Sequence, residues 1–133
     1  MAYWLVKSEP GTWSWADQER AGRTHWNGVR NAQALNNMRR MAVGDLAFFY
    51  HSGEERAVVG LVRIVRAFYP DPEDPKSGLV DVETVKRLPR PVTLKAIKAE
   101  AALADIALVR QSRLSVMPLD EAAFRRISAM AGL

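Results

Sequence analysis

The chain has 133 residues, of which 48% are hydrophobic and 26% are charged, the proportions of a globular domain rather than of a disordered or fibrous chain. It contains no cysteine and only two histidines, which excludes a disulfide framework, a thiolate nucleophile and a cysteine-based zinc site. The net charge of +4 is compatible with a polyanionic partner, and we expect one domain over residues 1–133 that needs no metal and no cofactor.

The first elements are a strand and a short helix. Tyr3–Lys7 is an apolar run that predicts a buried strand, and the proline and glycine that follow it predict a turn. Ser14 and Asp17 have the spacing of a capping box, so a helix should begin there and end near Ala21, where a glycine follows.

A second helix and a strand-rich segment come next. Asn31–Met41 has apolar residues three apart and an asparagine at the cap position, which predicts a helix. Leu46–His51 and Ala57–Tyr69 are apolar and rich in β-branched residues, which predicts two strands of a hairpin. Pro70–Gly78 is rich in proline and acids and predicts a loop, and the alternating Val80–Leu88 segment predicts a strand at a sheet edge.

The last third of the chain is mainly helical. Thr93 is placed to cap a short helix that ends near Glu100, and Leu119–Met130 has the pattern of an amphipathic helix. Ile106–Val116 fits neither a helix nor a strand clearly. Because strands and helices are mixed without regular alternation, a doubly wound sheet is disfavoured. We expect an α+β fold: a small, partly open β-barrel with peripheral helices.

The basic residues gather in three stretches without carboxylates: residues 20–44, 84–99 and 106–119. The first stretch alone contains five arginines. A fold that brings such stretches together would present a positive face to a polyanion. A merely solvated basic surface is an equally good interpretation of the charge pattern by itself.

Trp26 lies in a polar segment between arginines, asparagines and a glycine. That setting is typical of a base-stacking site, because an indole ring stacks a base while amides and hydroxyls bind its edge. Packing in the core is an equally good interpretation of Trp26. Trp4, Trp13 and Trp15 are expected to pack rather than bind. The polar end of the strand at Tyr50–Ser52 is a further candidate position for functional groups, although a strand that simply runs into solvent is the slightly better interpretation of this segment by itself.

Several ordered segments resemble the EVE domain family of the PUA-like superfamily. The resemblance covers the chain from Tyr3 to about Ile127 and rests on these segments: Tyr3–Pro10, Trp26–Asn31, Met38–Met41, Gly44-Asp45, Phe48–Ser52, Gly60–Val62, Tyr69–Pro72 and Ser112–Val116. The family resemblance implies a PUA-like pseudo-barrel related to the YTH domains, which bind N6-methyladenine in an aromatic cage. It also implies recognition of a modified base, with cytosine modifications in DNA or modified RNA as the leading candidates.

The resemblance implies a ligand-binding site as well. Trp26 matches the cage tryptophan that stacks the base, Ser8 and Asn31 match groups that bind its edge, and Arg30 and Arg113 are expected to pair with phosphate or with an anionic substituent. Arg39 and Arg40 are outer candidates for contact with the nucleic-acid backbone. The full set of expected site residues is Lys7, Ser8, Trp26, Arg30, Asn31, Tyr50, His51, Ser52, Arg113 and Ser115.

One departure from the family pattern concerns the aromatic cage. EVE relatives often carry an aromatic residue just before the strand that begins Val80-Asp81-Val82, and here Gly78-Leu79 occupies that place. A second aromatic wall must therefore come from elsewhere in the chain, or binding is weaker.

The resulting prediction is a non-enzymatic reader of a modified base in DNA or RNA. Two alternatives remain open: a small hydrolase of the related ASCH type, with Lys7 and Glu9 or His51 as base and acid, and an RNA-binding module that contacts only the backbone. No signal peptide and no membrane-spanning run is present in the sequence. We expect a monomer with no membrane partner, cytoplasmic for a bacterial-type chain and nuclear for a eukaryotic one.

Overall fold

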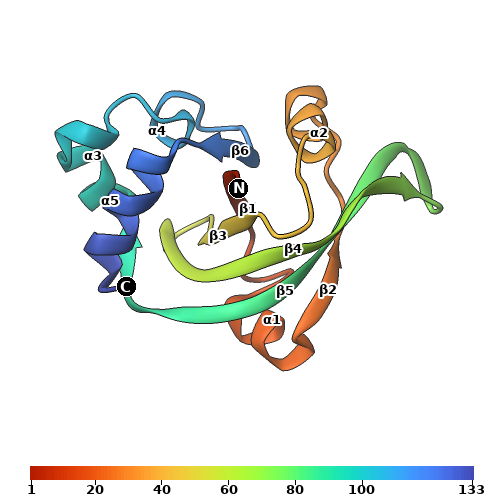
Figure 1. Ribbon diagram of the computed structural model, residues 1–133, viewed down its shortest axis with the longest axis horizontal. Helices are drawn as coiled ribbons and strands as arrows, with labels where there is room; N and C mark the ends of the chain where they lie inside the picture. Colours follow the sequence, from red (N-terminus) through yellow and green to blue (C-terminus); the bar gives the residue numbers. More distant parts are fainter.

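The computed structural model describes residues 1–133 and contains a mixed six-stranded sheet in the order β2–β5–β4–β3–β1–β6. The strands are β1 (Tyr3–Ser8), β2 (Arg23–Trp26), β3 (Leu46–His51), β4 (Ala57–Asp71), β5 (Asp74–Thr93) and β6 (Val116–Leu119). The helices are α1 (Trp15–Ala21), α2 (Ala32–Arg39), α3 (Leu94–Ala99), the 3-10 helix η1 (Ala101–Leu103), α4 (Ala107–Arg110) and α5 (Glu121–Ala131). Figure 1 shows the sheet curving around the core.

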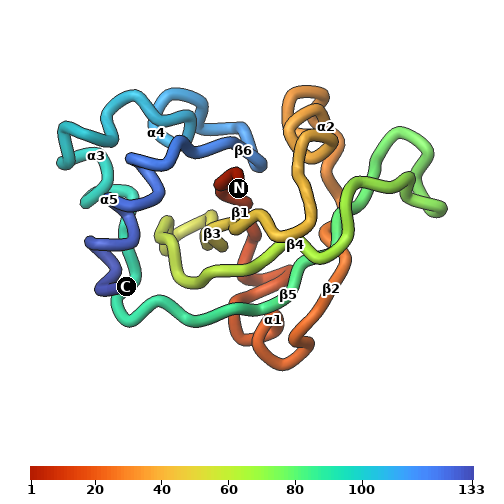
Figure 2. Tube along the Cα trace, in the orientation of Figure 1, coloured from red at the N-terminus to blue at the C-terminus, as the bar shows by residue number.

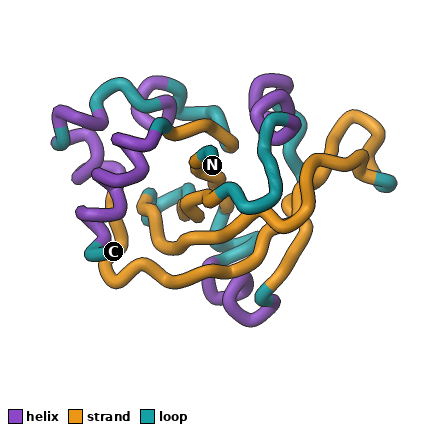
Figure 3. Tube along the Cα trace, viewed as in Figure 1, coloured by secondary structure: helices purple, strands orange, loops and turns teal.

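The sheet is a partly open barrel, as the sequence predicts, because its edge strands β2 and β6 do not pair with each other. Helices α3, α4 and α5 gather at one end of the sheet, whereas α1 and α2 lie apart from them (Figure 3). None of the helices is long and apolar enough to cross a membrane.

The centre of the sheet is the parallel pairing of β1 with β3. Both strands are almost entirely buried, which explains why their sequences are apolar throughout instead of alternating. In this register Lys7 lies opposite Tyr50, and Ser8 lies opposite His51. The polar residues that end the two strands are therefore neighbours at one edge of the core.

The predicted helix starts are confirmed by their caps. The hydroxyl of Ser14 accepts a hydrogen bond from the backbone N–H of Asp17 at 3.1 Å, and the Asp17 carboxylate accepts one from the N–H of Ser14 at 2.9 Å. Asn31 caps α2 through the N–H of Ala34, and Thr93 caps α3 in the same way. These bonds join residues three apart, so they depend on local sequence alone.

The predicted loop over Pro70–Gly78 is wrong, because β4 and β5 continue through it as a long hairpin that turns between Asp71 and Asp74. We call the projecting part, residues 66–81, the hairpin arm; it extends away from the sheet as the green segment in Figure 2. The strand pairing shifts register near Arg66 and again at Pro70. Such irregular ribbons tolerate proline because not every N–H is needed in the ladder.

The predicted edge position of Val80–Leu88 is also wrong. The polar strand β2 pairs antiparallel with this part of β5, with Trp26 opposite Val80. Strand β5 therefore lies second from the edge, between β2 and β4. The four residues of β2 lack the alternating apolar pattern that marks a strand in a sequence.

An aromatic cluster around Phe49 joins the sheet to α1. The ring of Phe49 makes edge contacts with Trp15 at 5.2 Å, Trp26 at 5.5 Å and His51 at 5.7 Å between centroids. The indole of Trp15 lies directly over Gly60 of β4, where a β-carbon would come within 2.3 Å of the ring. A residue without a side chain is thus required at position 60 for α1 to dock.

The carboxylate of Asp45 fixes the start of β1 against the start of β3. It accepts hydrogen bonds from the backbone N–H groups of Ala2 at 3.1 Å and Ala42 at 2.9 Å, and from the indole N–H of Trp4 at 3.0 Å. Burial of Asp45 acts to raise the pKa of its carboxyl, but these three hydrogen bonds outweigh burial, and the pKa is lowered from 3.8.

We expect Gly60→Ala to destabilise the protein by about 1–3 kcal/mol, because the added methyl group overpacks the interface with Trp15. The measurement is the urea unfolding midpoint. Gly11→Ala is the matched control, since a β-carbon at position 11 meets only the Glu9 carboxylate, at 3.9 Å. Equal midpoints for the two variants would contradict the proposed role of Gly60.

We expect Asp45→Asn to cost about 1–3 kcal/mol at pH 7, because an amide NH2 group would then face the N–H donors that the carboxylate now satisfies. The folded-state pKa of Asp45 lies below 3.8, so its contribution to stability is present above that pH and is lost as the pH falls through the folded value. The stability gap between wild type and variant should therefore narrow between pH 7 and pH 3 in urea titrations. A gap that stays constant would count against this account.

Candidate nucleic-acid interface

A cleft of about 690 Å³ opens beside the ends of β1 and β2. Two continuous stretches of chain supply most of its wall, one after β1 and one along β2 and the loop to α2. Its lining residues are Lys7, Ser8, Glu9, Thr12, Trp13, Thr24, His25, Trp26, Asn27, Gly28, Val29, Arg30 and Ser115. Ligand pockets span roughly 300–1,000 Å³, so the cleft has room for a nucleobase.

Five of the predicted site residues meet in this cleft: Lys7, Ser8, Trp26, Arg30 and Ser115. Trp26 is 7% exposed and contacts Phe49, so its interpretation as a core residue is confirmed, whereas its role in stacking a base stays a prediction. Its ring belongs to the core and also forms part of the wall of the cleft.

Lys7 is held at the cleft by a hydrogen bond from its ammonium Nζ to the carbonyl of Ser112 at 2.9 Å. The same Nζ lies 5.7 Å from the centroid of the Tyr50 ring. Partial burial lowers the pKa of Lys7 from 10.5. The lysine thus places a positive charge between the end of β1 and the segment before β6.

The hydroxyl of Ser8 donates a hydrogen bond to the carbonyl of Trp13, and the carbonyl of Ser8 accepts from the N–H of Ser52 at 2.9 Å. These bonds fold the segment after β1 back over the strand end. Trp13, which is half-buried, thereby joins the cleft wall, and its indole N–H donates to the side-chain oxygen of Gln18 at 3.0 Å.

The other five predicted residues lie outside the lining of this cleft. Both ring nitrogens of His51 are engaged: Nε2 accepts from the N–H of Trp15 at 2.9 Å, and Nδ1 lies 2.8 Å from the Glu55 carboxylate. Tyr50 is 3% exposed. Ser52 braces the turn after β1, as described above, while Asn31 and Arg113 line a separate, smaller hollow.

Sequence reasoning missed several members of the lining, above all Trp13. It also assigned no role to Thr12, Thr24, His25, Asn27, Gly28 and Val29. Three of these residues, His25, Asn27 and Val29, directly adjoin predicted ones, and extending each motif by a few residues would have included the others as well. Trp13 carries no such signal, because the fold of the turn around Ser8 decides where its ring lies.

The hairpin arm holds the loop between β2 and α2, which forms one wall of the cleft. The buried hydroxyl of Ser77 donates a hydrogen bond to the carbonyl of Val29 at 2.6 Å. Next to it, the guanidinium of Arg30 contacts the Asp74 carboxylate at 2.9 Å. Two adjacent contacts thus connect this cleft wall to the arm.

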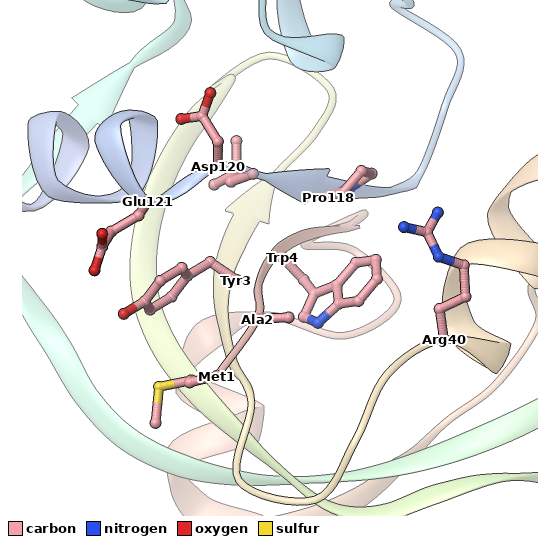
Figure 4. Close-up of a pocket in the computed structure, with 9 residues that line it drawn as sticks. Met1, Ala2, Tyr3, Trp4, Arg40, Pro118, Asp120 and Glu121 are labelled. Carbon is pink, nitrogen blue, oxygen red and sulfur yellow. The ribbon is translucent and has the colours of Figure 1, made fainter.

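A different hollow, of about 480 Å³, lies at the start of β1 (Figure 4). Arg40 reaches toward it, with its guanidinium 5.9 Å from the ring of Trp4. Asp120 and Glu121 also line this hollow. Its mixed charge makes it unsuited to a polyanion. Arg39 instead lies over the ring of Phe68 in the hairpin arm, at 5.0 Å.

The open mixed sheet with helices around it defines an α+β fold, and the cleft at the end of β1 is its candidate binding site. The sequence profile of the EVE domain matches residues 2–130, and the chain belongs to this family, which confirms the resemblance seen in the sequence.

Particular relatives are similar along the whole domain. Protein Atu2648 from Agrobacterium tumefaciens is 45% identical, with a TM-score of 0.97 over 100% of this chain and 94% of that one. Human THYN1 protein, in a crystal structure with DNA that contains 5-methylcytosine, is 30% identical, with a TM-score of 0.91 over 100% of this chain and 99% of that one. Thymocyte nuclear protein 1 of Gallus gallus is 34% identical over 92% of this chain, which matches 65% of the chicken protein.

We expect Ser77→Ala to destabilise the protein by about 1–3 kcal/mol, because the buried carbonyl of Val29 loses its donor. Hydrogen exchange of the amides from Gly28 to Asn31 should also accelerate. Ser128→Ala is the matched control, since the Ser128 hydroxyl is buried without a partner and its removal should be neutral or stabilising. Unchanged exchange in the loop of the Ser77 variant would show that the arm does not hold this wall.

Proposed function

We propose that the protein binds nucleic acid carrying a modified base and receives that base in the cleft between Lys7 and Arg30. The first candidate is 5-methylcytosine in DNA, because human THYN1 protein, which is similar over the whole chain, has been crystallised with such DNA. The protein acts as a reader, so the base leaves the cleft chemically unchanged.

The observation that carries the proposal is the pairing of aromatic and polar groups in one cleft of suitable size. Two indoles, Trp13 and Trp26, line it together with amide, hydroxyl and cationic side chains. Stacking on an aromatic ring stabilises a bound base by about 1–3 kcal/mol. Trp13 supplies the second aromatic wall that the segment at Gly78 lacks.

The position of Gly78 explains why no aromatic residue stands there. A β-carbon on Gly78 would lie 2.0 Å from the ring of Phe68, so the ring already fills the space where a side chain would begin. The aromatic ring at this place in the hairpin arm is thus Phe68 of β4, and the guanidinium of Arg39 lies over it.

Polar groups of the lining are suited to the edge of a cytosine. The Glu9 carboxylate forms no ion pair within the protein, and a carboxylate accepts hydrogen bonds from the exocyclic amine of cytosine. Asn27 also lines the cleft, whereas the side-chain oxygen of Asn31 caps α2. We therefore assign reading of the base edge to Glu9 and Asn27, with Asn31 retaining only its amide donors.

A non-enzymatic role is supported by how the candidate acid and base groups are used. His51 has a partner on each ring nitrogen, and Lys7 donates to the Ser112 carbonyl. General acid–base catalysis requires a group within hydrogen-bond reach of the reacting proton. His51 is not free to serve in this way without breaking one of these contacts, and the non-enzymatic assignment therefore rests on His51.

The test is a titration at fixed salt of single-stranded DNA oligonucleotides that contain one cytosine or one 5-methylcytosine, and of the matching RNA pair. Wild type should bind one modified strand more tightly than its unmodified counterpart. Trp13→Ala should lower that affinity at least about fivefold, since one stacked ring is lost. Tyr3→Ala is the matched control, because Tyr3 is a half-buried aromatic residue that stacks on Phe124 outside the cleft.

Trp26→Ala should abolish the preference for the modified strand. Because the Trp26 indole also packs on Phe49, the unfolding midpoint of this variant must be measured together with its affinity. Equal wild-type affinity for all four strands would refute base recognition and leave a module that contacts only the backbone. Hydrolysis of a modified nucleoside would instead support the enzymatic alternative.

A further inference from the structure

The smaller hollow next to the cleft is lined almost entirely by polar and cationic side chains. It measures about 310 Å³ and is lined by Asn31, Gln33, Arg110, Gln111, Ser112, Arg113 and Leu114. Six of these seven side chains are amides, guanidinium groups or a hydroxyl, and the lining contains neither a carboxylate nor an aromatic ring. Such a surface offers hydrogen-bond donors and positive charge to an anion, but nothing on which a base would stack.

The hollow is formed where two of the acid-free stretches of the sequence meet. Residues 31–33 belong to the first stretch and residues 110–114 to the third. Helix α2 is held against β6 by a hydrogen bond from the side-chain amide of Asn37 to the carbonyl of Val116, at 2.8 Å. The fold thereby places two neutral amides, those of Asn31 and Gln33, beside arginines that lie about 80 residues further along the sequence.

The hollow shares its walls with the base cleft. Arg30 lines the cleft and Asn31 lines the hollow, and in the same way Ser115 lines the cleft and Leu114 the hollow. The bond from Lys7 Nζ to the Ser112 carbonyl, 2.9 Å long, crosses the boundary between them. The hollow is therefore adjacent to the cleft that is proposed to hold the base.

Arg113 is the cation in this hollow that is free to bind. It is exposed and forms no ion pair with any carboxylate of the protein. Arg110 differs, because it pairs with Asp105 at the surface. The guanidinium of Arg113 has five N–H donors in a fork that matches two oxygens of a phosphate.

We propose that this hollow binds a backbone phosphate of the nucleotide next to the base in the cleft, with Arg113 as the principal ligand. Gln111 and Ser112 provide neutral donors beside it, and Lys7 contributes positive charge from the shared wall. The proposal rests on the proposed function and extends it, since it makes the preferred ligand a strand rather than a free nucleoside. Phosphate contacts of this kind fix position and carry no sequence information.

The experiment compares Arg113→Gln with wild type on the single-stranded DNA oligonucleotides that contain cytosine or 5-methylcytosine. The variant should bind both strands about tenfold more weakly, the effect of losing one charge-assisted contact. The ratio of the two affinities should stay at the wild-type value. The slope of log affinity against log salt should become shallower by about 0.7, the value for one phosphate of a single strand.

Arg125→Gln is the matched control, because Arg125 is an exposed arginine of α5 that lines neither cavity. It should leave the affinities and the salt slope unchanged. Both substitutions are at exposed positions, so their unfolding midpoints should equal that of wild type.

Two results would overturn the phosphate site. One is wild-type affinity and salt slope in Arg113→Gln, with the preference for the modified strand intact. The other is loss of that preference in Arg113→Gln, which would place Arg113 on the base itself. Equal affinity of the wild type for modified and unmodified strands is a separate result that refutes base reading, so failure of the phosphate site and failure of the proposed function are distinguishable.

Discussion

The position of the cleft wall at Trp26 depends on the aromatic contacts of the Phe49 ring. Trp15, Trp26 and His51 all meet it edge-on, and each comes from a different element: the start of α1, the end of β2 and the end of β3. Edge contacts between aromatic rings are directional, so they fix the angle as well as the distance between elements. Gly60 makes this arrangement possible, since only a bare backbone leaves room for the Trp15 indole. The buried face of the cleft is therefore an extension of the hydrophobic core.

The remaining wall of the cleft is built differently. The loop between β2 and α2 contributes little to the core and is held by the hairpin arm through Ser77 and Asp74. One contact is a buried hydrogen bond and the other a surface ion pair, which contributes little by itself. The aromatic side of the cleft is thus anchored in the core, whereas the opposite wall is held by few contacts.

In the proposed reader, recognition divides between the two adjoining cavities. The cleft contains the indoles and the polar groups to which we assign base reading, whereas the smaller hollow is lined mainly by amides and arginines. Selectivity and affinity then depend on different residues, because stacking and base-edge bonds respond to the base and phosphate contacts do not. Lys7 belongs to the boundary between the two and links the end of β1 to the segment before β6.

The sequence by itself determined the features that depend on near neighbours. Caps at Ser14, Asn31 and Thr93 join residues three apart, and the apolar runs of β1 and β3 reflect burial on both faces, so each was predicted correctly. Family resemblance also placed Trp26 and Lys7 at a shared site. Tertiary structure alone decided that the proline-rich segment continues as a strand. It also decided that Trp13 lines the cleft, that His51 instead binds the first residue of α1, and that Arg113 lines the adjacent smaller hollow. These outcomes follow from pairings between residues tens of positions apart, and no local pattern records which distant partner a side chain will meet.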